Sequence, residues 1–211
     1  MTEKRRCNAS TAMTRIKICG LSRACDIEAA NGARPDYIGF VFAARSHRRV
    51  TPECAMALRE RLHPSIQAVG VFVDEAIEVI ASIVEGGAID IVQLHGDEDE
   101  ATIERIKALT GRPVIKSVRV RSRESVQRWR NTCADFLLLD SASGGSGECF
   151  DWDAIGDVKR PFFLAGGITL ANIHAAIAKA RPFAIDLSSG VETNALKDPA
   201  KIAAIVASLR D

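Results

Sequence analysis

The chain has 211 residues, and its 28 lysine and arginine residues almost balance its 27 aspartate and glutamate residues, so the formal net charge is +1. This balance argues against nucleic acid and anionic membranes as partners, because proteins that bind them carry a basic excess. A hydrophobic fraction of 47% excludes disorder, and with only 5% aromatic residues the core must be largely aliphatic. Such a composition suits parallel strands covered by helices on both faces.

The N-terminal residues 1–14, MTEKRRCNASTAMT, are polar and aperiodic, which predicts a flexible extension before a domain at residues 15–211. Nothing in this segment reads as a signal peptide, and no apolar run approaches the ~20 residues of a membrane helix. The six cysteines include no CxxC pair. We therefore expect reduced thiols and a cytoplasmic protein.

Short apolar segments then recur at regular intervals, and each has the length of a buried strand. Helical patterns with acidic or Ser/Thr/Asp starts lie between them. The expected strands are residues 15–19, 37–42, 68–73, 89–94, 113–118, 136–140, 161–165 and 183–187. The expected helices are residues 28–31, 52–62, 75–85, 98–109, 122–129, 170–179 and 199–209, with only 152–158 available in the sixth connection.

Eight β-α units without a linker predict the α/β class and a single-domain (βα)8 TIM barrel, whose size range begins near ~200 residues. An open doubly wound sheet is the alternative fold. The segment after the first strand reads KICGLSRACDIE, which lacks the GxGxxG pattern of that fold. The closed barrel is therefore favoured.

Active sites of such barrels lie at the carboxyl ends of the strands, so reactive residues that end apolar runs are candidates. Cys19 ends the first strand, and Asp140 ends the LLLD run of the sixth. A lone cysteine is more often an inert apolar residue, and Asp140 could be a surface turn residue. Their places at strand ends of a barrel favour both residues as a catalytic acid/base pair. A buried carboxylate is also costly unless it is paired or functional.

Glycine-containing turns follow the last two strands, in the sequences AGGI and DLSSG. Loops after strands seven and eight bind phosphate in many barrels, although either turn alone could simply be tight. The phosphate-binding candidates are Gly166, Gly167, Ser188, Ser189 and Gly190, with Gly145 in the loop after strand six able to close over the same ligand.

Further polar residues at strand ends are candidates for substrate contact, namely Lys17, Gln93 and Asp186. Lys17 could also activate Cys19, because an unperturbed thiol with a pKa near ~8.5 is mostly protonated at pH 7. Arg48, in the sequence AARSHRRV, offers a bidentate partner for a carboxylate, although a solvated charge run is the simpler interpretation of its neighbours. Because no His/Asp/Glu cluster has ligand spacing, we expect no metal.

The ordered set of motifs in this chain resembles the phosphoribosylanthranilate isomerases of tryptophan biosynthesis. The motifs cover the chain from about residue 15 to its end, and they are KICG at 17–20, GFVF with SHR at 39–48, VGVFV at 69–73, VQLHGDE at 92–98, LLLDS with SGECFDW at 137–152, LAGGI with Asn172, and DLSSGVE with KD at 186–198. The resemblance implies an enzyme without a cofactor that converts N-(5-phosphoribosyl)anthranilate into its 1-deoxyribulose 5-phosphate isomer by an Amadori rearrangement.

By the same resemblance, the general base falls on Cys19, the general acid on Asp140 and the arginine that binds the anthranilate carboxylate on Arg48. The chain departs from the family at Glu148, where a basic residue is common, and at TNAL (193–196), which lacks the usual Pro-Gly. The alternatives are another phosphate-binding barrel enzyme, such as indole-glycerol-phosphate synthase or a ribulose-phosphate epimerase, and a non-catalytic barrel that binds a phosphorylated ligand. The sequence leaves both a monomer and a homodimer open.

Overall fold

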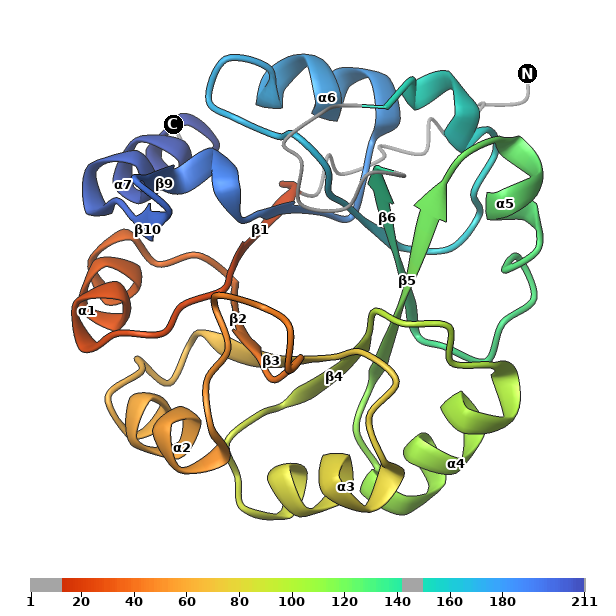
Figure 1. The fold of residues 1–211 in the computed structure, drawn as a ribbon. Coiled ribbons are helices and arrows are strands. Elements are labelled where there is room, and N and C mark those ends of the chain that lie inside the picture. Colours follow the sequence, from red (N-terminus) through yellow and green to blue (C-terminus); the bar gives the residue numbers. More distant parts are fainter. Residues whose placement is uncertain (1–12, 142–149, 211) are drawn as a thin grey trace, which may run out of the picture.

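The computed structural model describes residues 13–141 and 150–210. Within them, eight parallel strands form a closed barrel in chain order, and the last strand pairs with the first. Helices surround the ring of strands (Figure 1). The prediction of a (βα)8 barrel is therefore confirmed. Residues 1–12, the loop at 142–149 with Gly145 and Glu148, and residue 211 lie outside the described residues.

The strands of the barrel match the apolar segments of the sequence to within two or three residues at each end. Pro161 precedes the seventh strand instead of opening it; proline has no N–H to donate to the ladder. The strands are β1 (Arg15–Cys19), β2 (Tyr37–Val41), β3 (Gln67–Phe72), β4 (Ile91–Leu94), β5 (Val114–Val120), β6 (Phe136–Ser141), β7 (Phe162–Leu164) and β8 (Ala184–Leu187).

The outer helices also follow the sequence pattern, with one clear difference. The first helix spans ten residues, whereas its amphipathic signal predicted only 28–31, because the buried Asp26 near its start interrupts the apolar pattern. The helices are α1 (Ala24–Ala33), α2 (Pro52–Glu60), α3 (Ile77–Glu85), α4 (Glu100–Thr110), α5 (Arg123–Gln127), α6 (Ile173–Ala180) and α7 (Pro199–Ser208), with single turns η1 (Trp152–Ile155) and η2 (Ser189–Val191).

Two buried apolar layers hold the barrel together. One lies between the strands and the helices and includes Ile18, Phe40 and Leu139. The other fills the inside of the barrel, where Tyr37, Phe163 and Leu138 pack among smaller side chains. Because this filling closes the inside of the barrel, a ligand can bind only at an end.

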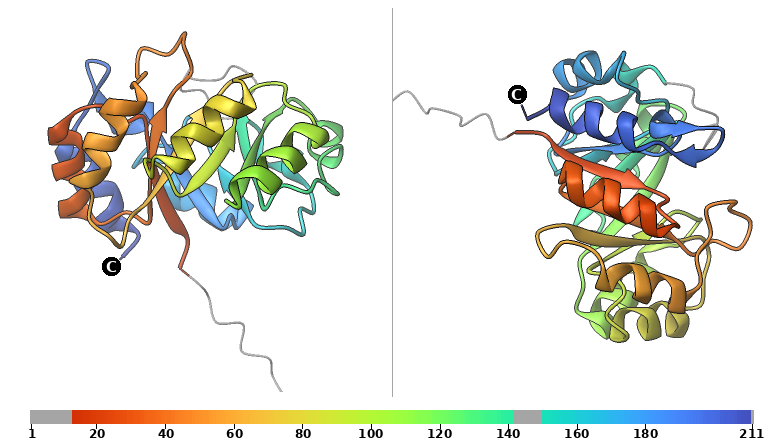
Figure 2. Two further views of the ribbon diagram at one scale, coloured as in Figure 1. Left: turned by 90° about the horizontal axis from the view of Figure 1, so that it is seen from below. Right: turned by 90° about the vertical axis from the view of Figure 1, so that its left-hand side faces the viewer.

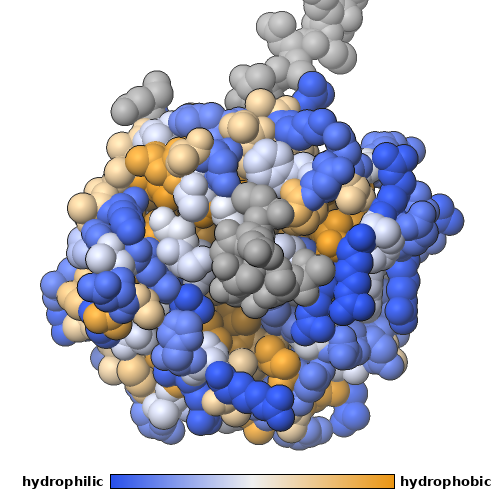
Figure 3. Space-filling view, turned by 45° about the horizontal axis from the view of Figure 1, so that its top comes forward, coloured by the Kyte–Doolittle hydropathy of each residue, from blue (hydrophilic) through white to orange (hydrophobic). Residues whose placement is uncertain are grey.

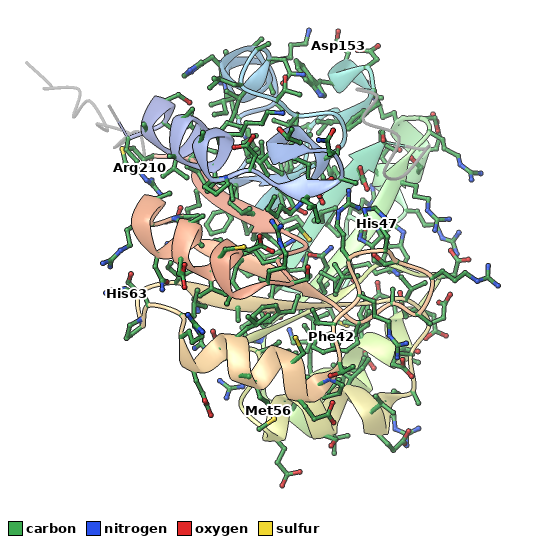
Figure 4. The ribbon with its side chains drawn as sticks, turned by 60° about the vertical axis from the view of Figure 1, so that its left-hand side comes forward. Phe42, His47, Met56, His63, Asp153 and Arg210 are labelled. Atoms are coloured by element: carbon green, nitrogen blue, oxygen red, sulfur yellow. The ribbon has the colours of Figure 1, made fainter. Side chains whose placement is uncertain are left out.

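The connections at the carboxyl ends of the strands form the mouth of the barrel. The connection between β2 and α2, which carries His47, projects from the end opposite to the one where β1 begins (Figures 2 and 4). A short antiparallel hairpin of β9 (Glu192–Thr193) and β10 (Leu196–Lys197) follows β8. The face shown in Figure 3 is dominated by hydrophilic residues, with smaller hydrophobic areas between them. No helix within the described ranges is long and apolar enough to span a bilayer.

Candidate active site

A cavity of about 240 Å³ opens at the carboxyl ends of the strands. It brings together most of the side chains that the sequence singled out, on strands that are far apart along the chain. These are Cys19, Arg48, Gln93, Asp140, Gly166, Gly167, Asp186, Ser188, Ser189 and Gly190. Lys17 is fully buried and does not line the cavity. It lies behind the cavity wall, where it contacts other protein groups and not a ligand in the cavity.

Asp186, which lines the cavity, forms a buried ion pair that joins the last strand to the first. Lys17 Nζ lies 3.0 Å from both carboxylate oxygens of Asp186, its register partner on β8. Burial alone would lower the pKa of Lys17, but the charges of Asp186 and Cys19 raise it above its usual value. Lys17 is therefore a permanent cation beside the cavity.

Cys19 ends β1 with its side chain at the bottom of the cavity and 8% exposed. Its neighbour in register is Gly39 on β2, where a Cβ would lie only 2.7 Å from Cys19 Sγ, so only glycine leaves room for the thiol. Burial raises the pKa of Cys19, and the charge of Asp186 adds to the rise, while Lys17 and Lys197 act in the opposite direction. The expected activation by Lys17 is thus present, but burial outweighs it.

Asp140 lies across the cavity, on β6, three places from β1 around the ring. Its Oδ1 accepts the backbone N–H of Ser141 at 2.8 Å, and its Oδ2 lies 3.5 Å from Nε2 of His95. His95 Nδ1 in turn lies 3.0 Å from the amide nitrogen of Gln93. Since that amide can only donate, Nδ1 accepts and the ring proton sits on Nε2, facing the carboxylate.

Arg48 reaches the cavity from the connection after β2, and Glu192 holds its guanidinium. Arg48 Nε and Nη2 donate to the two Glu192 oxygens at 2.7 and 2.8 Å. Lys197 also donates to Glu192 from the next strand of the hairpin. Burial alone would raise the pKa of Glu192, but these two cations lower it to about 2. The hairpin therefore holds a fixed anion that orients Arg48.

The side of the cavity next to Arg48 is apolar. Val41 on β2, Val71 on β3 and Cys19 form one buried cluster, with Ala43 packed against it. A flat hydrophobic group could lie against these side chains while a carboxylate on it reaches Arg48.

The glycine turns after β7 and β8 face the same cavity and touch each other. A Cβ at Gly190 would lie 2.0 Å from the carbonyl oxygen of Ile168, so glycine is required for the two turns to approach. Asn172 fixes the first turn by donating to the carbonyl of Gly167 at 2.9 Å. Small residues in such turns let backbone N–H groups approach an anion, which is the usual basis of phosphate binding in barrels.

The second turn is tied to the strand that carries the thiol. The Ser188 hydroxyl donates to the backbone carbonyl of Cys19 at 3.2 Å, and Lys197 Nζ donates to the carbonyl of Ser188 at 3.0 Å. Burial lowers the pKa of Lys197, against the effect of Glu192. The second glycine turn, the backbone of Cys19 and the pair of Arg48 with Glu192 therefore share one hydrogen-bonded network.

Lys116, which would be the lysine of a synthase-like barrel, lies outside this cavity. Its Nζ bonds Glu98 at 2.7 Å and the carbonyl of Gly96 at 2.8 Å, and it is 1% exposed. In the described part of the chain, no group of three or more His, Cys, Asp or Glu side chains is arranged as a metal site.

Sequence reasoning missed two members of the site, Glu192 and Lys197, and it gave His95, a polar residue at the end of the fourth strand, only a local hydrogen-bonding role. His95 stands one residue after β4, at the position where strand-end residues were sought, but one histidine between Leu94 and Gly96 gives no sign of its partner. Glu192 and Lys197 belong to the GVE and KD motifs of the resemblance, yet their contacts with Arg48 and Ser188 depend on the hairpin.

Comparison with known proteins decides the family. The family model described as N-(5'phosphoribosyl)anthranilate (PRA) isomerase matches residues 16–208. The chain belongs to this family. The N-(5'-phosphoribosyl)anthranilate isomerase of Endomicrobium trichonymphae is 47% identical over 202 residues, which cover 94% of this chain and 99% of the relative.

Solved structures of the PRA isomerase family agree with the sequence match. The phosphoribosyl anthranilate isomerase of Thermus thermophilus is 36% identical with a TM-score of 0.85, covering 93% of this chain and 98% of the other. A family member in complex with reduced 1-(o-carboxyphenylamino)-1-deoxyribulose 5-phosphate is 34% identical with a TM-score of 0.81, covering 92% of this chain and 97% of the other. The PRA isomerase fold thus extends over nearly the whole chain.

Proposed function

We propose that the chain catalyses the Amadori rearrangement of N-(5′-phosphoribosyl)anthranilate to 1-(2-carboxyphenylamino)-1-deoxyribulose 5-phosphate, in tryptophan biosynthesis in the cytoplasm. The observation that carries the proposal is that a thiol, a carboxylic acid, an arginine and two glycine turns line one cavity. Each of the four matches one part of this substrate and its reaction. Membership of the PRA isomerase family supports the same reaction.

The substrate is proposed to span the cavity from the turns to Arg48. The phosphate lies at the turns around Gly166 and Gly190, and the aromatic ring lies against Val41 and Val71. Because the pair with Glu192 uses Nε and Nη2 of Arg48, the Nη1 end of the guanidinium is left for the anthranilate carboxylate. Binding both anions at fixed places would orient the sugar between Cys19 and Asp140.

Ring opening needs an acid. Asp140 gives a proton to the ring oxygen while the bond from that oxygen to C1 breaks, and the anilinic nitrogen supplies the electron pair that forms the C1–N double bond. The product of this step is a cationic iminium, and Asp140 is left as a carboxylate. The Nε2–H of His95, 3.5 Å away, faces the negative charge that develops there.

Isomerisation then needs a base. The Cys19 thiolate takes the proton from C2, and the C–H electrons form a C1–C2 double bond as the iminium nitrogen recovers its electron pair. Tautomerisation of the resulting enol to the ketone completes the reaction. Burial raises the pKa of Cys19, and the cationic iminium favours the thiolate at the moment when the base is needed.

The test uses purified protein and freshly generated phosphoribosylanthranilate, whose fluorescence disappears on turnover. Cys19→Ala and Asp140→Asn are each expected to lower kcat by about 10² to 10⁴, as for loss of a general acid or base. Cys54→Ala is the matched control, because Cys54 lies on the outer helix α2. Turnover that survives in both site variants would overturn the roles of Cys19 and Asp140. No turnover by the wild type would favour a barrel that only binds phosphorylated ligands.

A further inference from the structure

A second cavity of about 380 Å³ adjoins the active site at the carboxyl end of β5. His95 lines both cavities, so the two are neighbours at the mouth of the barrel. The second cavity lies on the β5 side, whereas the glycine turns follow β7 and β8. None of its residues on β5 or α5 has a part in the reaction proposed above.

The lining of this cavity carries an excess of positive charge. Arg119, Arg121 and Arg128 all line it and are exposed, and none of their side chains has an ion-pair or hydrogen-bond partner within residues 13–141 and 150–210. Asp97 is the one carboxylate among the described lining residues. Lys116 also lines the cavity, but its bond to Glu98 neutralises it.

The wall of the cavity also holds an unpartnered buried hydroxyl. Ser117 is 7% exposed, and its Oγ has no hydrogen-bond partner in the described part of the chain. Leaving a buried polar atom unpaired destabilises a protein, and such atoms in native structures often mark a place where a ligand or water completes the bonding. An acceptor oxygen in the cavity would supply the missing partner.

The strand register places the first of the three arginines beside the proposed acid. Ser117 pairs with Leu138 and Arg119 pairs with Asp140 across the β5–β6 ladder. Leu138 belongs to the cluster that fills the inside of the barrel, and side chains alternate along a strand. Ser117 and Arg119 therefore lie on the inner face of β5. Arg119, near the carboxyl end of that strand, stands beside Asp140 at the mouth of the barrel.

We propose that this second cavity is an anion-binding subsite, formed by Ser117, Arg119, Arg121 and Arg128, that takes a phosphate or carboxylate group. Guanidinium groups bind such oxyanions in bidentate fashion, and the Ser117 hydroxyl donates to one oxygen. The anion belongs to a molecule other than the substrate, because the glycine turns and Arg48 already take the phosphate and the carboxylate of the substrate. The subsite does not depend on the isomerase reaction, because it uses none of the groups that carry it.

The experiment follows backbone amide signals of the full-length ¹⁵N-labelled protein by NMR while inorganic phosphate is added. Saturable shifts are expected at residues 117, 119, 121 and 128. Shifts at residues 166–167 and 188–190 report phosphate binding at the glycine turns. Loss of binding at the turns can therefore be told apart from loss of binding at the second cavity. No saturable shift at 117–128 in the wild type would overturn the proposal, whatever happens at the turns.

Variants identify the groups that bind. Arg119→Ala is expected to weaken phosphate binding at the 117–128 signals by about tenfold, the effect of one charge-assisted contact. Arg112→Ala is the matched control, because Arg112 is an exposed arginine before β5, at the other end of the same strand. If both variants weaken phosphate binding equally, binding depends on the net charge of the protein alone. That result would also overturn the subsite.

Ser117→Ala gives a second, independent readout. Removing an unpartnered buried hydroxyl is expected to raise Tm in phosphate-free buffer, and to weaken the phosphate response at the 117–128 signals. A rise in Tm with an unchanged phosphate response would contradict a role of Ser117 in binding.

The KM for phosphoribosylanthranilate tests whether the subsite is separate from the substrate site. In phosphate-free buffer, Arg119→Ala is expected to keep the wild-type KM while the NMR response to phosphate weakens. A rise in KM of about tenfold would place the substrate itself in the second cavity and would contradict a separate subsite.

Discussion

Lys17 and Asp186 face each other across the ladder that closes the barrel, and the Lys17 ammonium lies 3.0 Å from both Asp186 oxygens. This buried pair sits directly below the thiol of Cys19. Burial raises the pKa of Cys19; Lys17 lowers it, and Asp186 opposes Lys17. Burial is then left as the factor that decides the pKa of the thiol.

The pH dependence of the reaction follows from this balance. The pKa of Cys19 is raised above its ordinary value of 9.0, and only the deprotonated thiol can accept a proton. In Asp140→Asn, where the acid no longer titrates, the residual kcat/KM reports the ionisation of the thiol in the free enzyme, and it is expected to rise with pH and to continue rising beyond about pH 9. Initial rates from pH 6 to 10 check this expectation.

Cys19→Asp supplies the control for the pH profile. A carboxylate loses its proton at much lower pH than a thiol, so in the same Asp140→Asn background the rising limb is expected to move to the acidic side when Cys19 is replaced by Asp. A residual kcat/KM of Asp140→Asn that is already constant above pH 8 would show that the free enzyme holds a thiolate, and would contradict the dominance of burial.

Acid is expected to destabilise the protein through Glu192. Its pKa falls from an ordinary 4.5 to about 2 in the folded state, because Arg48 and Lys197 outweigh its burial. A lowered pKa stabilises the fold fully above about pH 4.5, and this contribution disappears as pH falls toward 2. It amounts to about 3 kcal/mol at most. Urea unfolding of the wild type and of Glu192→Gln at pH 7, 4 and 3 measures this contribution. The free energy of unfolding should fall less on acidification in the variant than in the wild type.

The matched control for Glu192 is Glu78→Gln, since Glu78 forms an exposed ion pair with Arg105 at 3.3 Å. Exposed pairs contribute little, so this variant is expected to follow the wild-type pH dependence. If Glu192→Gln follows it as well, the hairpin anion does not supply the acid-sensitive stability.

His95 is expected to act as a positioning residue for Asp140. Loss of the imidazole that faces the developing carboxylate at 3.5 Å in His95→Ala should lower kcat roughly tenfold, corresponding to ~1.4 kcal/mol, with little change in KM. His95→Gln keeps an N–H donor near the place of Nε2 and should recover much of kcat. Steady-state kinetics of the two variants check this, and a change confined to KM would assign His95 to substrate binding instead.

The turn of the β9–β10 hairpin is expected to carry removable strain. Asn194 and Ala195 have φ angles of +53° and +60°, the left-handed region that two-residue hairpin turns require. Alanine is unfavourable there, so Ala195→Gly should stabilise the protein by about 1 kcal/mol, measured by urea unfolding. Ala203→Gly on helix α7 should have the opposite sign, because glycine is unfavourable in a helix interior. A loss of stability in Ala195→Gly would contradict strain at this turn.

Much of the fold was predictable because strand and helix signals alternate along the whole chain. The run from Arg15 to Cys19 was delimited to the residue, since Gly20 and the polar segment after it end the apolar pattern. The predicted first helix is too short because a buried aspartate breaks the apolar pattern. Asp26 can be buried since its carboxylate accepts hydrogen bonds from the backbone N–H groups of Ser22 and Arg23, and the spacing of apolar residues does not reveal such bonds. The glycine turns were located because glycine and serine leave a local signal of their own.

The site was predictable only as far as strand ends reveal it. Cys19 and Asp140 each end an apolar run, so the topology alone brings them to one end of the barrel. The pairing of Arg48 with Glu192 could not be predicted, because 144 residues separate them and the contact depends on the two-residue turn of the hairpin. The place of Lys17 two residues before Cys19 was predictable, but its complete burial against Asp186 was not.

The ladder between β1 and β8 joins the beginning of the barrel to its end. The proposed base is on the first strand, whereas Asp186, the partner of Lys17, is on the last strand, and one of the two glycine turns follows it. During synthesis, Cys19 is therefore among the first residues of the domain to be made but has no site until β8 has been released. Any product of premature termination before residue 184 would carry the thiol without Asp186 and without the turn that follows β8.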